Sequence, residues 1–383
     1  MSNAANIDIR VGDMFASGAQ TLVNTVNTEG VMGKGIALEF KRRFPNMYDD
    51  YAWRCARREV RLGEPYLYRG LYEPWILNFP TKLHWRSHSR LADIEAGLRY
   101  LRDRYNEWGV TSMAVPPLGC GHGGLEWRVV GRVLYQAFRE FEIPILLYAP
   151  YGTPEEQLTV KFLANADPQL AMDSGPVRIP PAWVAIVVIV AALEQQQPYR
   201  WRVGRTAFQK IAYFATEAGL PTHLDFIKSS YGPFASDLNR MKAVLINNGL
   251  LAEEPLGRMV EVKPGPALDH AREAYTQALS EWASIVARVT DLFLRMDTRQ
   301  AEVAATVHFA ATRLIENRGP TELDVMNAVK DWKARRRPVL TDEEIAVAIR
   351  NLLLHGWIDV EPSRALPLPL DLRLTDEADL SAA

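Results

Sequence analysis

Two glycine-rich segments constrain the fold of this chain more than any other feature. They are residues 22–45 (LVNTVNTEGVMGKGIALEFKRRFP) and residues 116–127 (PPLGCGHGGLEW), and each joins a strand-like apolar run to a helical pattern. Glycines let backbone N–H groups turn toward one point, and the N-terminus of the following helix adds the positive end of its dipole. As residues alone, the segments are either two tight turns or a clamp for a diphosphate, and their matching context favours the clamp.

The pattern around these segments predicts an α/β domain. Short apolar runs alternate with helical periods from residue 7 to about residue 150, which is typical of a sheet covered by helices on both faces. Ligands of such three-layer folds bind beyond the carboxyl ends of the strands. Neither glycine-rich segment has the spacing of a P-loop, and a G-x-G-x-x-G fingerprint is absent from the proper context. The expected strands are Ile7–Val11, Thr21–Val26, Trp75–Phe79, Ser112–Pro116 and Ile145–Tyr148.

The 383 residues are enough for two domains. We expect a first domain at 1–155, a linker rich in Pro, Asp and Gly at 156–181, and a mainly helical, winged-helix-like domain at 182–383. The most apolar run, AWVAIVVIVAAL at 182–193, is shorter than the roughly 20 residues that span a bilayer, so it predicts a buried helix.

Charge and cysteine content exclude several classes of protein. Residues 1–150 carry 19 Lys/Arg against 16 Asp/Glu, whereas the remainder carries 25 against 30. This difference favours an anionic ligand for residues 1–150 and a basic protein partner for the rest of the chain. Two cysteines provide neither a disulfide framework nor a metal set, so no metal and no organic cofactor is expected. The first residues lack the pattern of a signal peptide, and we expect a cytoplasmic protein.

Three motifs together resemble the macrodomain family. They are VNTVNTEGVMGKGIALEFKRRFP, NFPTKLHW and PLGCGHGGLEW, and the resemblance covers about residues 6–150. More narrowly, they are similar to the branch that contains terminal ADP-ribose glycohydrolases and the DarG-type DNA ADP-ribosyl glycohydrolase antitoxins. This resemblance implies a three-layer α/β/α macrodomain with a mixed sheet, and ADP-ribose as the ligand.

The resemblance assigns ligand contacts to residues of these motifs. Asp13 would accept a hydrogen bond from the adenine amino group, and Asn24 and Asn27 would bind the distal ribose, with Asn24 also counted as catalytic. From the residues alone, Asp13 has the alternative of a helix cap or an exposed turn, and the two asparagines have the alternative of buried strand-end residues that satisfy turns. The other expected ligand-binding residues are Met14, Val31, Met32, Gly33, Lys34, Gly35, Ile36, Thr81, Pro117, Leu118, Gly119, Cys120, Gly121, His122, Gly123, Gly124 and Leu125.

Lys82 in NFPTKLHW is the main catalytic candidate. It follows the expected strand Trp75–Phe79, where a side chain can project into a cleft. A lysine with a lowered pKa can attack an opened ribose aldehyde or protonate a leaving base. Without the resemblance, a solvated surface lysine would be the ordinary interpretation.

The chain departs from the family pattern at Gly123. Protein-directed members of this branch have an aspartate at the matching position, which completes a lysine–aspartate pair. DarG-like sequences have glycine there, so the resemblance favours DNA-linked ADP-ribose as the substrate. Either Glu29, His122 or Glu126 replaces the missing carboxylate, or no residue does.

The helical part resembles the SocA-like, Panacea-type antitoxin domain. The resemblance rests on GRTAFQKIAYFATEAG at 204–219 and SSYGPFASDLNRMKAVLINNGLL at 229–251. Basic residues are few, and Arg335–Arg337 is the only basic cluster, so the composition favours a protein partner over DNA. Toxin, DNA or both stay open as partners of this domain.

The leading hypothesis is an antitoxin with two activities. The macrodomain would hydrolyse ADP-ribose from bases of ADP-ribosylated single-stranded DNA, with a thymidine-type N-glycosidic linkage favoured, and the helical domain would bind a DarT-like ADP-ribosyltransferase toxin. One alternative is a hydrolase of free ADP-ribose 1″-phosphate or O-acetyl-ADP-ribose, and another is a non-catalytic ADP-ribose reader. The residues leave open which base is modified, whether the mechanism is covalent, and the oligomeric state.

Overall fold

The computed structural model describes residues 6–164, 179–196, 202–257, 259–315 and 319–367. The chain divides into two compact units. The first contains residues up to Ile179, together with the later segments Asn239–Val260 and Gly265–Ala267, and the second contains the rest. The domain limits at 155 and 181 stay predictions, but the later return of the chain to the first unit was not expected.

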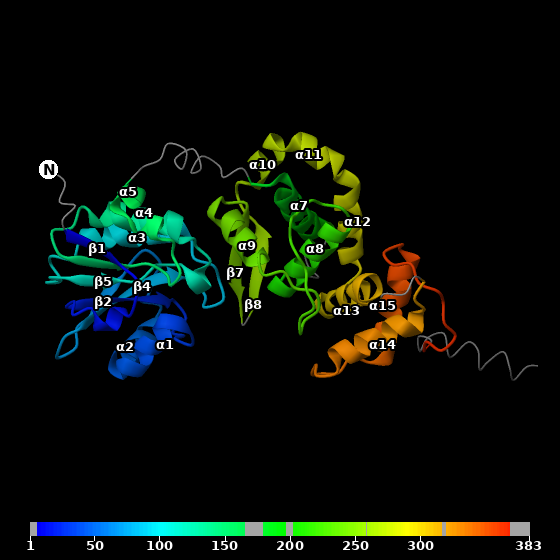
Figure 1. Ribbon diagram of the computed structural model, residues 1–383, viewed down its shortest axis with the longest axis horizontal. Coiled ribbons are helices and arrows are strands. Elements are labelled where there is room, and N and C mark those ends of the chain that lie inside the picture. The colour runs from blue at the N-terminus through cyan, green and yellow to red at the C-terminus, as the bar shows by residue number, and fades with distance from the viewer. Residues whose placement is uncertain (1–5, 165–178, 197–201, 258, 316–318, 368–383) are drawn as a thin grey trace, which may run out of the picture. The chain divides into compact units, whose positions relative to one another are not determined.

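The first unit is built on a six-stranded mixed sheet (Figure 1). All neighbouring strands are parallel except the edge strand β3, which is antiparallel to β4. This confirms the mixed sheet; β3 itself was missed because its three half-buried residues carry no alternating pattern. In spatial order the strands are β1 (Ile7–Arg10), β6 (Ile145–Tyr148), β5 (Met113–Val115), β2 (Thr21–Asn27), β4 (Trp75–Lys82) and β3 (Tyr66–Tyr68).

Helices cover both faces of this sheet, as the alternating pattern predicts (Figure 1). On one face, α1 (Gly35–Arg43) and α2 (Pro45–Ala56) bury Phe40, Met47 and Tyr51 in one core. On the other face, α3 (Leu91–Arg102) and α4 (Trp127–Phe138) bury a second core. Each amphipathic helix thus contributes one apolar stripe, and the domain has the expected three layers.

Strand order brings three loops together. β5, β2 and β4 are neighbours, and β2 is parallel to both of the others. Both glycine-rich loops and the segment after Lys82 therefore leave the sheet at the same edge, beyond the carboxyl ends of adjacent strands. A β-bulge lies at this edge, because Val26 pairs with Pro80 but Asn27 pairs with Lys82. Such bulges often re-aim a side chain next to a functional site.

The second unit is mostly helical. Its first helix, α7 (Pro181–Gln196), is buried on nearly all sides and packs against α8 (Arg205–Glu217) and α12 (Ala283–Leu294), which confirms the predicted buried helix. Among the described residues, no helix is both long and apolar enough to cross a membrane. The remaining helices are α10 (Leu268–Ala274), α11 (Thr276–Glu281), α13 (Thr298–Phe309), α14 (Glu322–Lys333) and α15 (Asp342–Leu354), with a π-helical turn at Ala310–Leu314.

The returning segment of the first unit holds most of α9 (Leu238–Asn247) and all of β7 (Leu251–Leu256), which forms a two-stranded sheet with β8 (Met259–Pro264). Asn247 Oδ1 accepts a hydrogen bond of 2.8 Å from the Leu91 N–H at the start of α3. Glu253 accepts hydrogen bonds of 2.9 and 3.0 Å from the backbone N–H and Nδ1 of His88. The segment after Lys82 is thus fixed by residues far along the chain.

Candidate functional site

Asn27 shapes the first glycine-rich loop. Its Oδ1 accepts from the backbone N–H groups of Glu29 and Val31 at 2.9 and 3.4 Å, and its Nδ2 donates to the Val31 carbonyl at 2.6 Å. The hydroxyl of Tyr51 donates to the Asn27 carbonyl at 2.8 Å. Asn27 therefore satisfies a turn, as the residue-based alternative has it, and its contact with ribose stays a prediction.

Asn24 lies inside the sheet rather than at the end of its strand. Its Nδ2 donates to Asn78 Oδ1 at 2.9 Å, and Met32 Sδ lies 3.9 Å from the same nitrogen. The residue is fully buried, and its Oδ1 has no hydrogen-bond partner among the described residues. A ligand can reach this acceptor only if a neighbour such as Met32 moves, so the catalytic role of Asn24 also stays a prediction.

The second glycine-rich loop lies beside the first. After Gly119, whose φ is +73°, it forms a single 3₁₀ turn over Gly121–Gly123. A Cβ atom on Gly35, the first residue of α1, would lie 3.8 Å from His122 Cδ2. The two loops thus meet next to the N-terminus of α1, where Lys34 makes no side-chain capping bond. This is the arrangement that suits a diphosphate.

Lys82 ends β4 at the junction of these loops. The bulge sets it opposite Asn27 on β2. Its half-buried side chain reaches the second loop, where Nζ donates a hydrogen bond to the His122 carbonyl. A titratable amine is therefore held between the strand that carries the first loop and the turn that forms the second.

Gly123 lies close to the side chains of both Ser89 and Lys82. A Cβ atom at position 123 would lie 3.8 Å from Lys82 Cε but only 2.6 Å from Ser89 Oγ. An aspartate could not occupy position 123 unless Ser89 moved. Ser89 thus occupies space that a carboxylate at position 123 would need.

The three candidates for the missing carboxylate differ in their surroundings. Glu29 and His122 are exposed. Glu126 is engaged by two arginines, because its carboxylate oxygens accept from Arg128 at 2.5 Å and from Arg240 at 2.7 Å. Glu126 is consequently the least available of the three as a proton acceptor.

The other predicted ligand residues fall into three groups by exposure. Asp13 is exposed and caps the turn that follows it, accepting from the Phe15 N–H at 2.9 Å, as the residue-based alternative expects. Burial raises the pKa of the Cys120 thiol to about 12, so it is no nucleophile near neutral pH. Val31, Gly33, Lys34, Gly35 and Gly121 are exposed, Ile36, Pro117, Cys120, Gly124 and Leu125 are half-buried, and Met14, Met32, Thr81, Leu118 and Gly119 are buried.

Sequence reasoning missed three residues that shape this site. Asn78 is part of the NFPTK motif, and its register opposite Asn24 was the available signal. Tyr51 gave no signal, because a helical tyrosine on an apolar face is ordinary core. Ser89 precedes a helix, where serine is typical of a cap.

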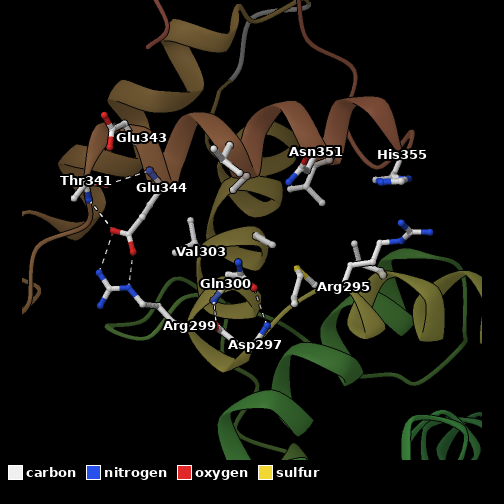
Figure 2. Close-up of a pocket in the computed structure, with 16 residues that line it drawn as sticks. Arg295, Asp297, Arg299, Gln300, Val303, Thr341, Glu343, Glu344, Asn351 and His355 are labelled. Carbon is white, nitrogen blue, oxygen red and sulfur yellow. Dashed lines mark hydrogen bonds and ion pairs between the residues drawn. The ribbon is translucent and has the colours of Figure 1, made fainter. Parts of the chain in front are cut away.

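The second unit has a pocket of its own (Figure 2). It encloses about 660 Å³ and is lined by residues of α12, α13 and α15 and the segments next to them. Its rim is occupied by internal pairs: Glu344 accepts from Arg299 at 2.5 and 3.0 Å, and Asp297 and Gln300 form a capping box. Such internal pairs are typical of a junction between packed helices, and we propose no ligand for this pocket.

The GRT…QK and YGPF motifs of the second unit meet in its interior. Lys210 is almost fully buried and donates to the Pro233 carbonyl at 2.8 Å. Burial, together with the nearby Lys333, lowers the pKa of Lys210 to about 7. Both motifs thus have a packing role, while the resemblance to an antitoxin domain stays a prediction.

Comparison with known proteins agrees with the site in the first unit. A family model of the Macro domain matches residues 23–134. The three-layer domain with its mixed sheet, the paired glycine-rich loops and this match define a macrodomain.

Relatives extend the match to nearly the whole chain. A DNA ADP-ribosyl glycohydrolase of Thermus aquaticus is 33% identical over 374 residues, which are 96% of this chain and 98% of that protein. A DNA ADP-ribosyl transferase–DNA ADP-ribosyl glycohydrolase fusion protein of Thermosipho africanus is 40% identical over 42% of this chain and 47% of its own length. The solved macrodomain of Mycobacterium tuberculosis DarG is 46% identical and covers 38% of this chain and 97% of its own, with a TM-score of 0.37. The present chain belongs to the DNA ADP-ribosyl glycohydrolase family and is an ADP-ribosyl glycohydrolase.

Proposed function

We propose that this enzyme removes ADP-ribose from modified bases of single-stranded DNA, with Lys82 as its catalytic residue. The observation that carries the proposal is the position of Lys82, between Asn27 on β2 and the His122 carbonyl in the second loop. Cleavage of the bond between C1″ and a base nitrogen needs a proton for the leaving base and support for the cationic sugar. Lys82 is a titratable group that lies at the junction of both loops.

Lys82→Ala tests the catalytic assignment. The variant should bind ADP-ribose like the wild type but lose about 10²–10⁴-fold in turnover of an ADP-ribosylated oligonucleotide. Lys161→Ala, at an exposed lysine of α5 (Val160–Ala164), is the matched control and should keep full turnover. Near-wild-type turnover by Lys82→Ala would overturn the assignment and turn attention to Glu29 and His122.

DNA as the substrate is supported by the names of the relatives and by Gly123. A carboxylate at position 123 would add negative charge beside an already anionic strand, whereas Gly123 and Ser89 add none. We favour a thymidine-type linkage. Competition between thymidine-linked and guanine-linked oligonucleotides, ADP-ribose 1″-phosphate and O-acetyl-ADP-ribose should rank the thymidine-linked strand first, and a preference for either free metabolite would refute the DNA substrate.

The partner that we propose is a DarT-like ADP-ribosyltransferase toxin bound by the helical unit. The Thermosipho relative, whose name joins a transferase to a glycohydrolase in one chain, supports this partner. The acidic excess after residue 150 suits a basic protein surface. The full-length Lys82→Ala protein, unable to reverse the modification, should still co-purify with the transferase, and failure to do so would remove the binding activity from the proposal.

A further inference from the structure

Ser89 has an unusual environment for a serine. It is fully buried, and its Oγ has no hydrogen-bond partner among the described residues. Buried hydroxyls are almost always paired, because an unpaired one loses its bonds to water without replacement. The Ser89 hydroxyl can therefore still form a hydrogen bond with a ligand.

Helix capping does not supply a partner for this hydroxyl. Ser89 lies two residues before α3, and Leu91 opens the helix. Arg90 is the N-cap residue of α3, and the Leu91 N–H donates to Asn247 Oδ1 at 2.8 Å rather than to Ser89. The Ser89 backbone N–H donates to the Gly123 carbonyl at 2.9 Å, which fixes the residue to the second loop.

The glycines of the second loop leave room for this side chain. A Cβ atom on Gly119 would lie 3.1 Å from Ser89 Cβ, and one on Gly123 would lie 2.6 Å from Ser89 Oγ. The same Gly123 position is 3.8 Å from Lys82 Cε. The unpaired hydroxyl and the catalytic lysine therefore approach the same point of the loop.

We propose that Ser89 is a substrate-contacting residue, whose hydroxyl bonds the ribose that is held beside Lys82 and released by the reaction. A hydroxyl both donates and accepts, so it can pair with a ribose hydroxyl and adds no charge next to the diphosphate or the DNA strand. Binding then supplies a partner for the hydroxyl, which has none among the described residues. The inference rests on the proposed role of Lys82, which brings the reacting ribose to this place.

The test is Ser89→Ala in the full-length protein, with ADP-ribose as the probe. Calorimetry should show an affinity about tenfold lower than the wild type, and kcat/KM on the ADP-ribosylated oligonucleotide should fall by at least as much. The thermal midpoint of the ligand-free variant should be equal to or higher than that of the wild type, because the change removes an unpaired buried hydroxyl. A serine with a merely structural role would give the opposite sign, a lower midpoint with unchanged affinity.

Ser87→Ala is the matched control. Ser87 belongs to the same segment, is also buried, and also has an Oγ without a partner among the described residues. Its replacement should leave the midpoint equal or raised but keep ADP-ribose affinity unchanged. Equal affinity in Ser89→Ala and wild type would overturn the proposal.

The test of Ser89 as a ligand contact can be distinguished from the test of Lys82 as the catalytic residue. If Lys82→Ala stays active while Ser89→Ala still loses ADP-ribose affinity, the lysine assignment fails and Ser89 remains a ligand contact. If Lys82→Ala behaves as expected and Ser89→Ala binds normally, only the serine proposal fails.

Discussion

Asn24 and Asn78 face each other in register on β2 and β4 and share a buried hydrogen bond of 2.9 Å. The bond fixes the orientation of the Asn24 amide and leaves its Oδ1 without a partner among the described residues. Met32, only 2% exposed, lies against the same amide. If Asn24 contacts ribose, neighbouring side chains must move when the ligand binds, and we expect Met32 to be one of them.

Methyl NMR tests this movement. Addition of ADP-ribose should shift the Met32 methyl resonance strongly, because a flexible thioether that leaves its site changes its surroundings completely. Met47, fully buried in the same core, provides the internal control and should shift little. A Met32 signal that stays in place at saturating ligand would contradict this movement.

Lys82→Arg separates charge from proton transfer. Arginine keeps the positive charge and the ability to donate to the His122 carbonyl, but it does not release a proton near neutral pH. Binding of ADP-ribose should therefore persist while turnover falls about 10²-fold or more. Steady-state kinetics beside calorimetry measures both, and full turnover by the arginine variant would mean that the lysine contributes only its charge.

Gly123→Ala should be costly, and a second change should relieve it. The added methyl would lie 2.6 Å from Ser89 Oγ and 3.2 Å from Ser89 Cβ, so the loop or the serine must shift. We expect a loss of about 1–3 kcal/mol in the free energy of unfolding, the usual range for overpacking. The double variant Gly123→Ala/Ser89→Gly should recover most of this loss, and a double-mutant cycle without coupling would contradict the contact.

Two glutamates of the second unit provide a matched pair for stability. Glu302 is buried and accepts hydrogen bonds from Lys333 at 3.2 Å and from Arg336 at 2.9 and 3.0 Å. Glu302→Gln leaves these buried cations without a counter-charge and should cost about 3–5 kcal/mol. Glu344→Gln, at a partly exposed ion pair with Arg299, should cost at most about 1 kcal/mol. Urea unfolding of both variants, followed through amide protection in α13, decides whether burial sets the difference.

His308 predicts the acid sensitivity of the second unit. Burial lowers its pKa to about 4, with smaller contributions from Arg313 and Arg288, and its Nδ1 lies 2.8 Å from the Tyr213 hydroxyl. Between pH 6.5 and 4 the imidazole of His308 is protonated in the unfolded chain but stays neutral in the folded chain. Stability is therefore complete above pH 6.5 and should fall by about 1.4 kcal/mol per pH unit below it. His308→Gln should flatten this slope in urea unfolding at pH 7 and pH 5, and an unchanged slope would show that other groups cause it.

The sequence predicted the layers of the first unit because alternating strand and helix periods depend on local burial. The helical period over 268–296 predicts a single helix, and this prediction is wrong. The structure divides these residues at Tyr275 and Trp282 into α10, α11 and α12, without a glycine or proline as a signal. Positions in the two glycine-rich loops were visible as motifs. Ser89 was not, since the burial of an unpaired hydroxyl depends on tertiary packing, which leaves no local pattern in the sequence.

The return of Asn239–Val260 to the first unit has a consequence for the protein during its synthesis. The six strands of the sheet are all present once Tyr148 has left the ribosome, but the partners of Leu91 and His88 come from Asn247 and Glu253. At about 5–20 residues per second, synthesis of the chain from Tyr148 to Glu253 takes roughly 5–20 s. During that interval the segment after Lys82 lacks the bonds that fix it, so this edge of the sheet is completed only while the following helices are already being synthesised.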